Sequence, residues 1–159
     1  MGHRLIHGAS ESCALPHGHN GLVTVRLNAT TPARLDGLGN MAISFQQAKG
    51  TWHRFVDEKL DHALQLAQDD PLLDWFLVHE PARAQRIVVT PGDPTTELMA
   101  CLLMAKINAF LRHEGGILRC TELSLQETPT NTVCFSGNPE DFIPQTTFSR
   151  TPWWQRADM

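Results

Sequence analysis

Two histidines separated by one glycine, His17 and His19, open the most regular apolar alternation in the chain. Over residues 18–29 apolar side chains occupy alternate positions, which predicts a strand with one buried face. Side chains at i and i+2 of a strand point to the same side, so both imidazoles can bind one ion there. Cys13 lies four residues before this pair, where a bound cation would favour its thiolate. The pattern predicts a metal-dependent active site at one end of a sheet.

Length and charge limit the classes of protein. The 159 residues fit one domain, residues 1–159, in which we expect the tail from about 138 to 159 to be peripheral. A net charge of −4 without a basic run argues against nucleic acid as a partner. No apolar stretch approaches the ~20 residues that cross a membrane, and no signal peptide is visible, so we expect a cytoplasmic protein without a membrane partner. Cys101, Cys120 and Cys134 are then expected to be reduced core residues.

The other periodicities predict two helices and several strands. Apolar residues at spacings of three and four predict a helix over 45–60 and a second helix that starts at Asp93-Pro94 and ends at Gly115-Gly116. Strands are expected at 18–29, 86–90, 117–128 and 132–136, with a stub of a first strand at 3–7 and an irregular acidic segment after 62. Two helices on one face of an antiparallel four-stranded sheet give an α+β fold with a truncated first strand.

Six short motifs follow one another along the chain: His3-Arg4-Leu5, Cys13 to His19, Asn40 to Phe45, Leu60-Asp61-His62, Pro94 to Glu97 and Glu127-Thr128. In this order they resemble the family of 6-pyruvoyl- and 6-carboxytetrahydropterin synthases. Each is weak alone, but six in sequence are hard to obtain by chance. The resemblance implies the tunnelling fold (T-fold), in which such units close into an oligomeric barrel of three that stacks as a homohexamer, a dimer of trimers. Covering open sheet edges by oligomerisation makes physical sense.

The resemblance implies a zinc site made by His3, His17 and His19. Zn²⁺ held by three histidines keeps an open position that a substrate hydroxyl can take up. His7 is an alternative to His3 as the third ligand.

The resemblance also implies a group that moves protons. Cys13 matches the family's proton-abstracting cysteine, and Asp61 with His62 matches the rest of a triad that an adjacent subunit supplies. In such a triad the aspartate orients the imidazole ring and favours its charged form.

Substrate-binding residues follow from the same motifs. Glu127 matches the carboxylate that accepts two N–H bonds from the pterin ring, and Thr95 and Thr96 would add contacts to it. Three cations are candidates for binding a triphosphate: Arg4, Lys49 and Lys106.

The implied substrate is 7,8-dihydroneopterin triphosphate. The spacing between Cys13 and His17 favours 6-carboxytetrahydropterin synthase, a zinc-dependent lyase of queuosine (7-deazaguanine) biosynthesis that releases triphosphate and acetaldehyde. The first alternative is 6-pyruvoyl-tetrahydropterin synthase, whose cysteine lies further from the histidine pair. A folate-directed aldolase branch carries glutamate in place of the cysteine, and Glu11 keeps it open. A non-catalytic zinc- or pterin-binding homologue is suggested by Ser44, which replaces a family aspartate.

Overall fold

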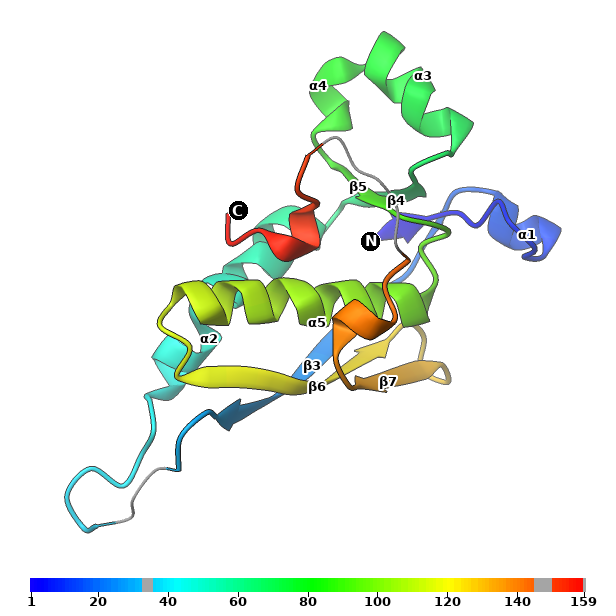
Figure 1. The fold of residues 1–159 in the computed structure, drawn as a ribbon. Helices are drawn as coiled ribbons and strands as arrows, with labels where there is room; N and C mark the ends of the chain where they lie inside the picture. The colour runs from blue at the N-terminus through cyan, green and yellow to red at the C-terminus, as the bar shows by residue number, and fades with distance from the viewer. Residues whose placement is uncertain (33–35, 145–149, 159) are drawn as a thin grey trace.

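The computed structural model describes residues 1–32, 36–144 and 150–158, with helices and strands that form a mixed α+β architecture (Figure 1). In chain order its elements are β1 (Gly2–His3), α1 (Glu11–Ala14), β2 (His17–Gly18), β3 (Leu22–Ala29), α2 (Phe45–Phe55), a π-helix (Val56–Leu60), β4 (Leu64–Ala67), α3 (Pro71–His79), α4 (Pro81–Ala84), β5 (Ile87–Thr90), α5 (Thr96–His113), β6 (Leu118–Gln126), β7 (Thr132–Ser136) and two 3-10 helices (Pro139–Asp141 and Trp153–Gln155). None of the helices described is long and apolar enough to cross a membrane.

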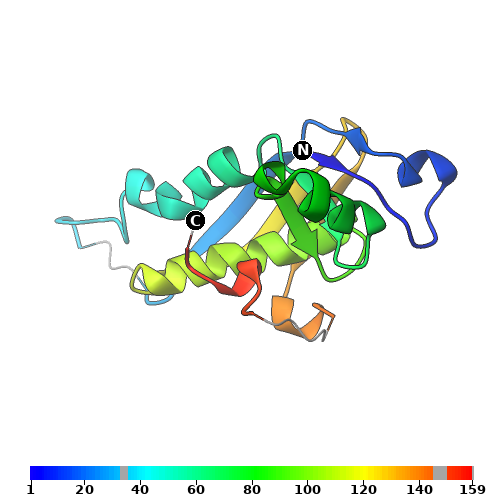
Figure 2. The ribbon, with the colours of Figure 1, turned by 90° about the horizontal axis from the view of Figure 1, so that it is seen from above.

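The strands described form two sheets. One has the order β2-β1-β4-β5 and is mixed, because β4 runs parallel to both of its neighbours whereas β1 and β2 are antiparallel. The other, β3-β6-β7, is antiparallel throughout. The α+β class is therefore confirmed, and the prediction of a single antiparallel four-stranded sheet is wrong. Figure 2 shows α2 and α5 side by side over one face of β3 and β6.

The second sheet exists because the segment after His62, expected to be irregular, contains β4 and α3. Gln65, Leu66 and Ala67 of β4 are buried, so this strand belongs to the interior although no alternation marks it. The Asp70 carboxylate then accepts a bond from the Leu72 N–H and caps α3, with a proline at its first position.

The expected helix over 45–60 is interrupted at Gly50. This glycine has φ 39° and ψ −145°, a conformation that costs a residue without a side chain little. The break frees the Thr51 N–H, which donates to the Glu114 carboxylate at 3.2 Å. Ser44, the departure from the family's aspartate, caps α2 by accepting from the Gln47 N–H, so a structural role accounts for it.

The core lies between α5 and the antiparallel sheet. From α5 it contains Met99, Leu102, Leu103 and Phe110, with β6 residues Cys120, Leu123 and Leu125 opposite and Trp52 and Phe55 of α2 beside them. In β6, the pairing with β3 shifts register between Arg26 and Leu27, so that both Cys120 and Leu123 face inward. The tail also contributes, since Trp154 is 2 % exposed and belongs to this cluster. Cys101 and Cys120 are buried as predicted, but Cys134 is exposed on β7, so the prediction that it is a core residue is wrong.

Candidate metal centre and active site

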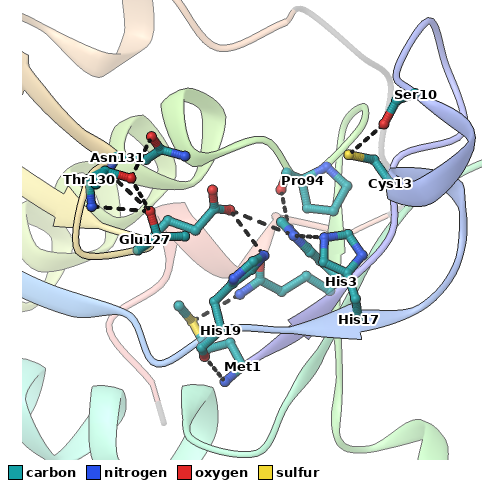
Figure 3. A network of polar contacts seen from close by, with 12 residues as sticks. Met1, His3, Ser10, Cys13, His17, His19, Pro94, Glu127, Thr130 and Asn131 are labelled. Carbon is teal, nitrogen blue, oxygen red and sulfur yellow. Dashed lines mark hydrogen bonds and ion pairs between the residues drawn. The ribbon is translucent and has the colours of Figure 1, made fainter.

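Two short strands bring three histidines together. β1 and β2 pair antiparallel with His3 opposite His17, and the chain continues directly to His19, whose N–H bonds the Met1 carbonyl. Every pair of rings among the three lies with centroids 4.6 to 5.2 Å apart. One ring nitrogen from each histidine lies within 4.8 Å of the other two, so the three can hold one metal ion (Figure 3). We call this set the histidine cluster.

Backbone carbonyls fix two of these rings. His3 Nδ1 lies 3.0 Å from the Pro94 oxygen and His17 Nδ1 lies 2.8 Å from the Leu15 oxygen. A carbonyl oxygen only accepts, so each Nδ1 carries the proton and each neutral ring presents an unprotonated Nε2. These two Nε2 atoms are 3.1 Å apart with no proton between them, which is unfavourable unless a cation binds both. Two imidazoles on a tetrahedral zinc would place these atoms roughly 3.3 Å apart. The donor set therefore fits a metal ion.

The burial of His3 favours the neutral ring that a metal ion requires. His3 is 8 % exposed, and this burial, more than the neighbouring His17 ring, lowers its pKa below the ordinary value. A lowered pKa keeps His3 neutral at neutral pH, as a metal ligand must be. Carbonyl partners on the opposite ring nitrogen also orient the ring and raise its basicity toward the metal.

His7, the alternative third ligand, lies elsewhere. Its Nδ1 is 3.0 Å from an Asp93 oxygen and its Nε2 is 3.2 Å from an Asp69 oxygen, so both ring nitrogens face carboxylates. The hydrogen bond to Asp93 raises the His7 pKa and favours the charged ring, which cannot ligate a metal. The geometry therefore favours His3.

Glu127 lies at the end of β6 with its carboxylate directed at the histidine cluster (Figure 3). One oxygen is 3.6 Å from His3 Nε2 and 3.9 Å from His19 Nε2. Glu127 borders a cavity of about 20 Å³ shared with His3, His19 and Thr96, and also an open groove of about 460 Å³ on its other side. The first holds little more than one water or ion, whereas the second has the size of a small-molecule site. Glu127 thus connects the candidate metal position with the space for a ligand.

Cys13 lies on the segment between His3 and His17, in the four-residue helix α1. Its Sγ accepts a hydrogen bond from Ser10 Oγ at 3.2 Å, and its carbonyl accepts from the Leu5 N–H. Figure 1 shows α1 projecting away from both sheets. The candidate base is therefore attached near the cluster but on an exposed arm.

Asp61 and His62 form a pair immediately after the π-helix. His62 Nδ1 is 2.8 Å from an Asp61 oxygen, and this bond lowers the Asp61 pKa. The side chain of His62 is 85 % exposed and that of Asp61 is 63 % exposed. His62 has a positive φ of 57°, which is uncommon for a residue other than glycine. Both residues share an open groove with His17, a groove whose lining does not include Cys13.

The two threonines differ. The Thr95 hydroxyl accepts from the Leu98 N–H and caps α5, so the prediction that α5 starts at Asp93-Pro94 is wrong by two residues. Thr96 lines the small cavity beside the histidine cluster. The Asp93 carboxylate instead accepts bonds from the N–H groups of Ile6 and His7.

The candidate triphosphate ligands are not equally available. Lys106 is 1 % exposed and donates to the carbonyl oxygens of Arg156 and Asp158, under the tail. Burial lowers its pKa to about 8. Arg4 is engaged by both oxygens of Asp70, while Lys49 is exposed on α2. Lys106 is therefore covered by the tail and not available to a phosphate in solvent.

Gln65, which replaces an asparagine of the family pattern, borders the site although the sequence did not predict it as a site residue. It lies beside His3 in the sheet, is 2 % exposed and lines the cavity at the cluster. Because β4 has no alternating pattern, its side chains could not be assigned to a face. The Leu60-Asp61-His62 motif just before it was the available signal.

Comparison with known proteins agrees with this geometry. A sequence model described as 6-pyruvoyl tetrahydropterin synthase matches residues 1–138. The chain is 33 % identical over 134 residues to a 6-carboxy-5,6,7,8-tetrahydropterin synthase of Rickettsia felis, covering 84 % of this chain and 89 % of that protein. The namesake of Rickettsia conorii is 32 % identical with the same coverage.

A solved structure supports the fold. An uncharacterized protein of Wolinella succinogenes superposes with a TM-score of 0.67 at 22 % identity, covering 86 % of this chain and 92 % of that one. The family match extends from β1 through β7, and so includes every residue of the histidine cluster, Cys13, the Asp61–His62 pair and Glu127. The chain belongs to the 6-pyruvoyl tetrahydropterin synthase family.

Proposed function

We propose that this protein is a 6-carboxy-5,6,7,8-tetrahydropterin synthase that converts 7,8-dihydroneopterin triphosphate with loss of triphosphate and acetaldehyde. It would act in the cytoplasm in queuosine (7-deazaguanine) biosynthesis. The observation that carries the proposal is the histidine cluster, in which the Nε2 atoms of His3 and His17 lie 3.1 Å apart, a separation that suits two ligands of one metal ion. The named Rickettsia relatives support this branch of the family.

We infer that the cofactor is Zn²⁺, which His3, His17 and His19 would hold. Three neutral imidazoles are a usual ligand set for catalytic zinc, which supplies Lewis acidity to a substrate hydroxyl and the adjacent C–H. The chain's own part is to keep Nε2 of His3 and His17 unprotonated and aimed at one point, through the carbonyls of Pro94 and Leu15.

Proton transfer is assigned to Cys13 with the Asp61–His62 pair. Asp61 accepts from His62 Nδ1, which orients the ring and leaves its Nε2 to exchange a proton. The pair is exposed, and Cys13 does not line the groove that the pair shares with His17. Following the family resemblance, we infer that a neighbouring subunit supplies the pair to each Cys13, in a homo-oligomer built as a dimer of trimers. The edge strand β3 offers eight residues for pairing between subunits.

Glu127 binds the pterin. Its carboxylate borders the open groove of about 460 Å³, where it can accept two parallel N–H bonds from the amino-pyrimidinone edge. In the free protein it faces His3 and His19 instead, so binding requires its side chain to turn toward the ligand. Thr96 lines the small cavity at the histidine cluster, and Thr95 lies next to it in the chain while its hydroxyl caps α5.

The test is product analysis by mass spectrometry after zinc-loaded protein is mixed with 7,8-dihydroneopterin triphosphate, with Cys13→Ala as the matched variant. A 6-carboxy product with acetaldehyde, lost in the variant, is the expected result. A pyruvoyl product would instead assign the triphosphate elimination performed by the other branch, which the family's own description names. Zinc and pterin binding without turnover would identify a non-catalytic homologue.

A further inference from the structure

The segment between His3 and His17 has to place Cys13 beside the histidine cluster, yet it has little core of its own. None of the residues of α1 is buried, and the helix projects from the molecule in both views (Figures 1 and 2). Its position depends on contacts made by the residues that connect it to β1, Leu5 to His7. We call these residues the root of the arm. One such contact is the bond from the Leu5 N–H to the Cys13 carbonyl at 2.8 Å, which ties the cysteine to the chain that leaves β1.

The carboxylate of Asp93 binds the root through the backbone of Ile6 and His7. One carboxylate oxygen accepts from the Ile6 N–H at 3.0 Å and the other from the His7 N–H at 2.7 Å. His7 Nδ1 adds a third contact at 3.0 Å. The Asp93 side chain is 9 % exposed. Burial raises the pKa of this carboxyl, but the bonds from Ile6 and His7 outweigh that and hold its pKa below the ordinary value, so Asp93 is ionised.

The residue after Asp93 fixes a metal ligand. Pro94 provides the carbonyl oxygen that orients His3 through its Nδ1. One dipeptide therefore bonds the His3 ring through Pro94 and the root of the Cys13 arm through Asp93. Asp93 is not needed to cap α5, because the Thr95 hydroxyl does so.

Building on the proposed function, we propose that Asp93 is a positioning residue that sets the place of Cys13 relative to the metal ligand His3. It acts through the backbone of Ile6 and His7 and the Leu5–Cys13 bond, and it touches neither substrate nor metal. The His7 side chain makes a further contact with the same carboxylate, and Asp69, 3.2 Å from His7 Nε2, fixes the orientation of the ring. An aspartate suits this role because one ionised carboxylate can accept several N–H bonds at once, each stronger than a bond to a neutral acceptor.

The first readout is steady-state kinetics of zinc-loaded Asp93→Ala and Asp93→Asn. Misplacing a catalytic group by about 1 Å costs on the order of 100-fold in rate, so we expect kcat of Asp93→Ala to fall between about 10-fold and 100-fold with little change in KM. Asp93→Asn keeps an acceptor oxygen for the backbone and should recover part of the loss. Asp141→Ala, at an exposed aspartate that contacts Asn138, is the matched control and should keep wild-type kinetics.

The second readout needs no substrate and so is independent of the assigned reaction. Cys101 and Cys120 are buried, and burial raises the pKa of each thiol to about 11, so in a Cys134→Ser background iodoacetamide reports on Cys13. We expect Asp93→Ala to change the Cys13 alkylation rate severalfold and Asp93→Asn to lie between it and the parent. An unchanged rate, or a kcat loss that added zinc restores fully, would overturn the positioning role. Absence of the 6-carboxy product in the parent protein would instead overturn the proposed function.

Discussion

The histidine cluster and the residues proposed for proton transfer are held in opposite ways. Carbonyls from distant and local backbone, Pro94 and Leu15, fix the rings of His3 and His17, and the cluster is complete within one chain. His62 is 85 % exposed and bonds its immediate neighbour, while Cys13 sits on a projecting arm. The difference teaches that the candidate metal site is complete in one folded chain, whereas the proposed proton transfer needs residues of a second chain. Mutations in the two regions should therefore have separable effects.

The largest expected effect is on metal content. His3→Ala removes the one buried ligand and leaves two, so we expect zinc to fall from stoichiometric to a small fraction and all turnover to disappear. Elemental analysis after dialysis, with circular dichroism to verify folding, measures it. His53→Ala is the control, because His53 lies on α2 and pairs with Asp57. Full zinc in His3→Ala would show that the cluster is not the metal site. The contrast between the cluster and the residues proposed for proton transfer would then have no basis.

The next effect is confined to catalysis. Cys13→Ala should lower kcat by about 10²–10⁴-fold, the usual contribution of a positioned acid or base, while zinc content stays at the wild-type value. The same assay on Cys134→Ser, at an exposed cysteine of β7, should show no change. A variant that lost zinc together with activity would place Cys13 among the ligands and remove the distinction between the two regions.

Mixing inactive variants tests whether chains share proton-transfer residues. If His62 of one chain serves Cys13 of another, random mixed oligomers of Cys13→Ala and His62→Ala contain about a quarter of sites with both groups intact. Activity should therefore return to about a quarter of the wild-type value after the two are unfolded and refolded together. Separately refolded samples serve as the control. No recovery in a verified mixed oligomer would mean that each chain uses its own pair.

The dipeptide Asp-Pro marks the start of a helix at one place in this chain and not at another, although only the second was predicted to start a helix. Asp-Pro is a good helix start, and at Asp70-Pro71 the carboxylate does cap α3. At Asp93-Pro94 the identical pair lies outside the helix, because the Asp93 carboxylate is taken by the backbone of Ile6 and His7. That competition joins residues more than 80 positions apart and leaves no local trace.

The parallel pairing of β4 with its two neighbours could not be predicted from the sequence either. The alternation in β3 and β6 was visible because one face of an antiparallel sheet is buried, and both strands were predicted. β4 lies between two parallel neighbours with Gln65, Leu66 and Ala67 all buried, so it shows no period of two. The histidines of the cluster were predictable from spacing and motif, whereas the carbonyls that orient them depend on the turn before α5.

The smallest effect concerns the ion pair between Arg4 and Asp70, next to His3. Arg4, next to His3, donates to both oxygens of the buried Asp70, and these bonds, with the Leu72 N–H, outweigh burial and lower the Asp70 pKa. A carboxyl with a lowered pKa stabilises the fold above its unfolded pKa near ~4 and loses this contribution as pH falls through the folded value. Asp70→Asn should therefore reduce the free energy of unfolding by about 2 kcal/mol at pH 7 and by less near pH 3.

Urea unfolding at both pH values measures this difference, with Asp74→Asn on the exposed face of α3 as the control. Zinc stoichiometry should be unchanged, because the β1–β2 pairing and the Pro94 carbonyl hold His3 independently of Arg4. If the variant also lost zinc, the ion pair would be part of the metal site's support, and the cluster would be less self-contained than its hydrogen bonds indicate. A destabilisation equal at both pH values would mean that the packing of Asp70 contributes more than its charge.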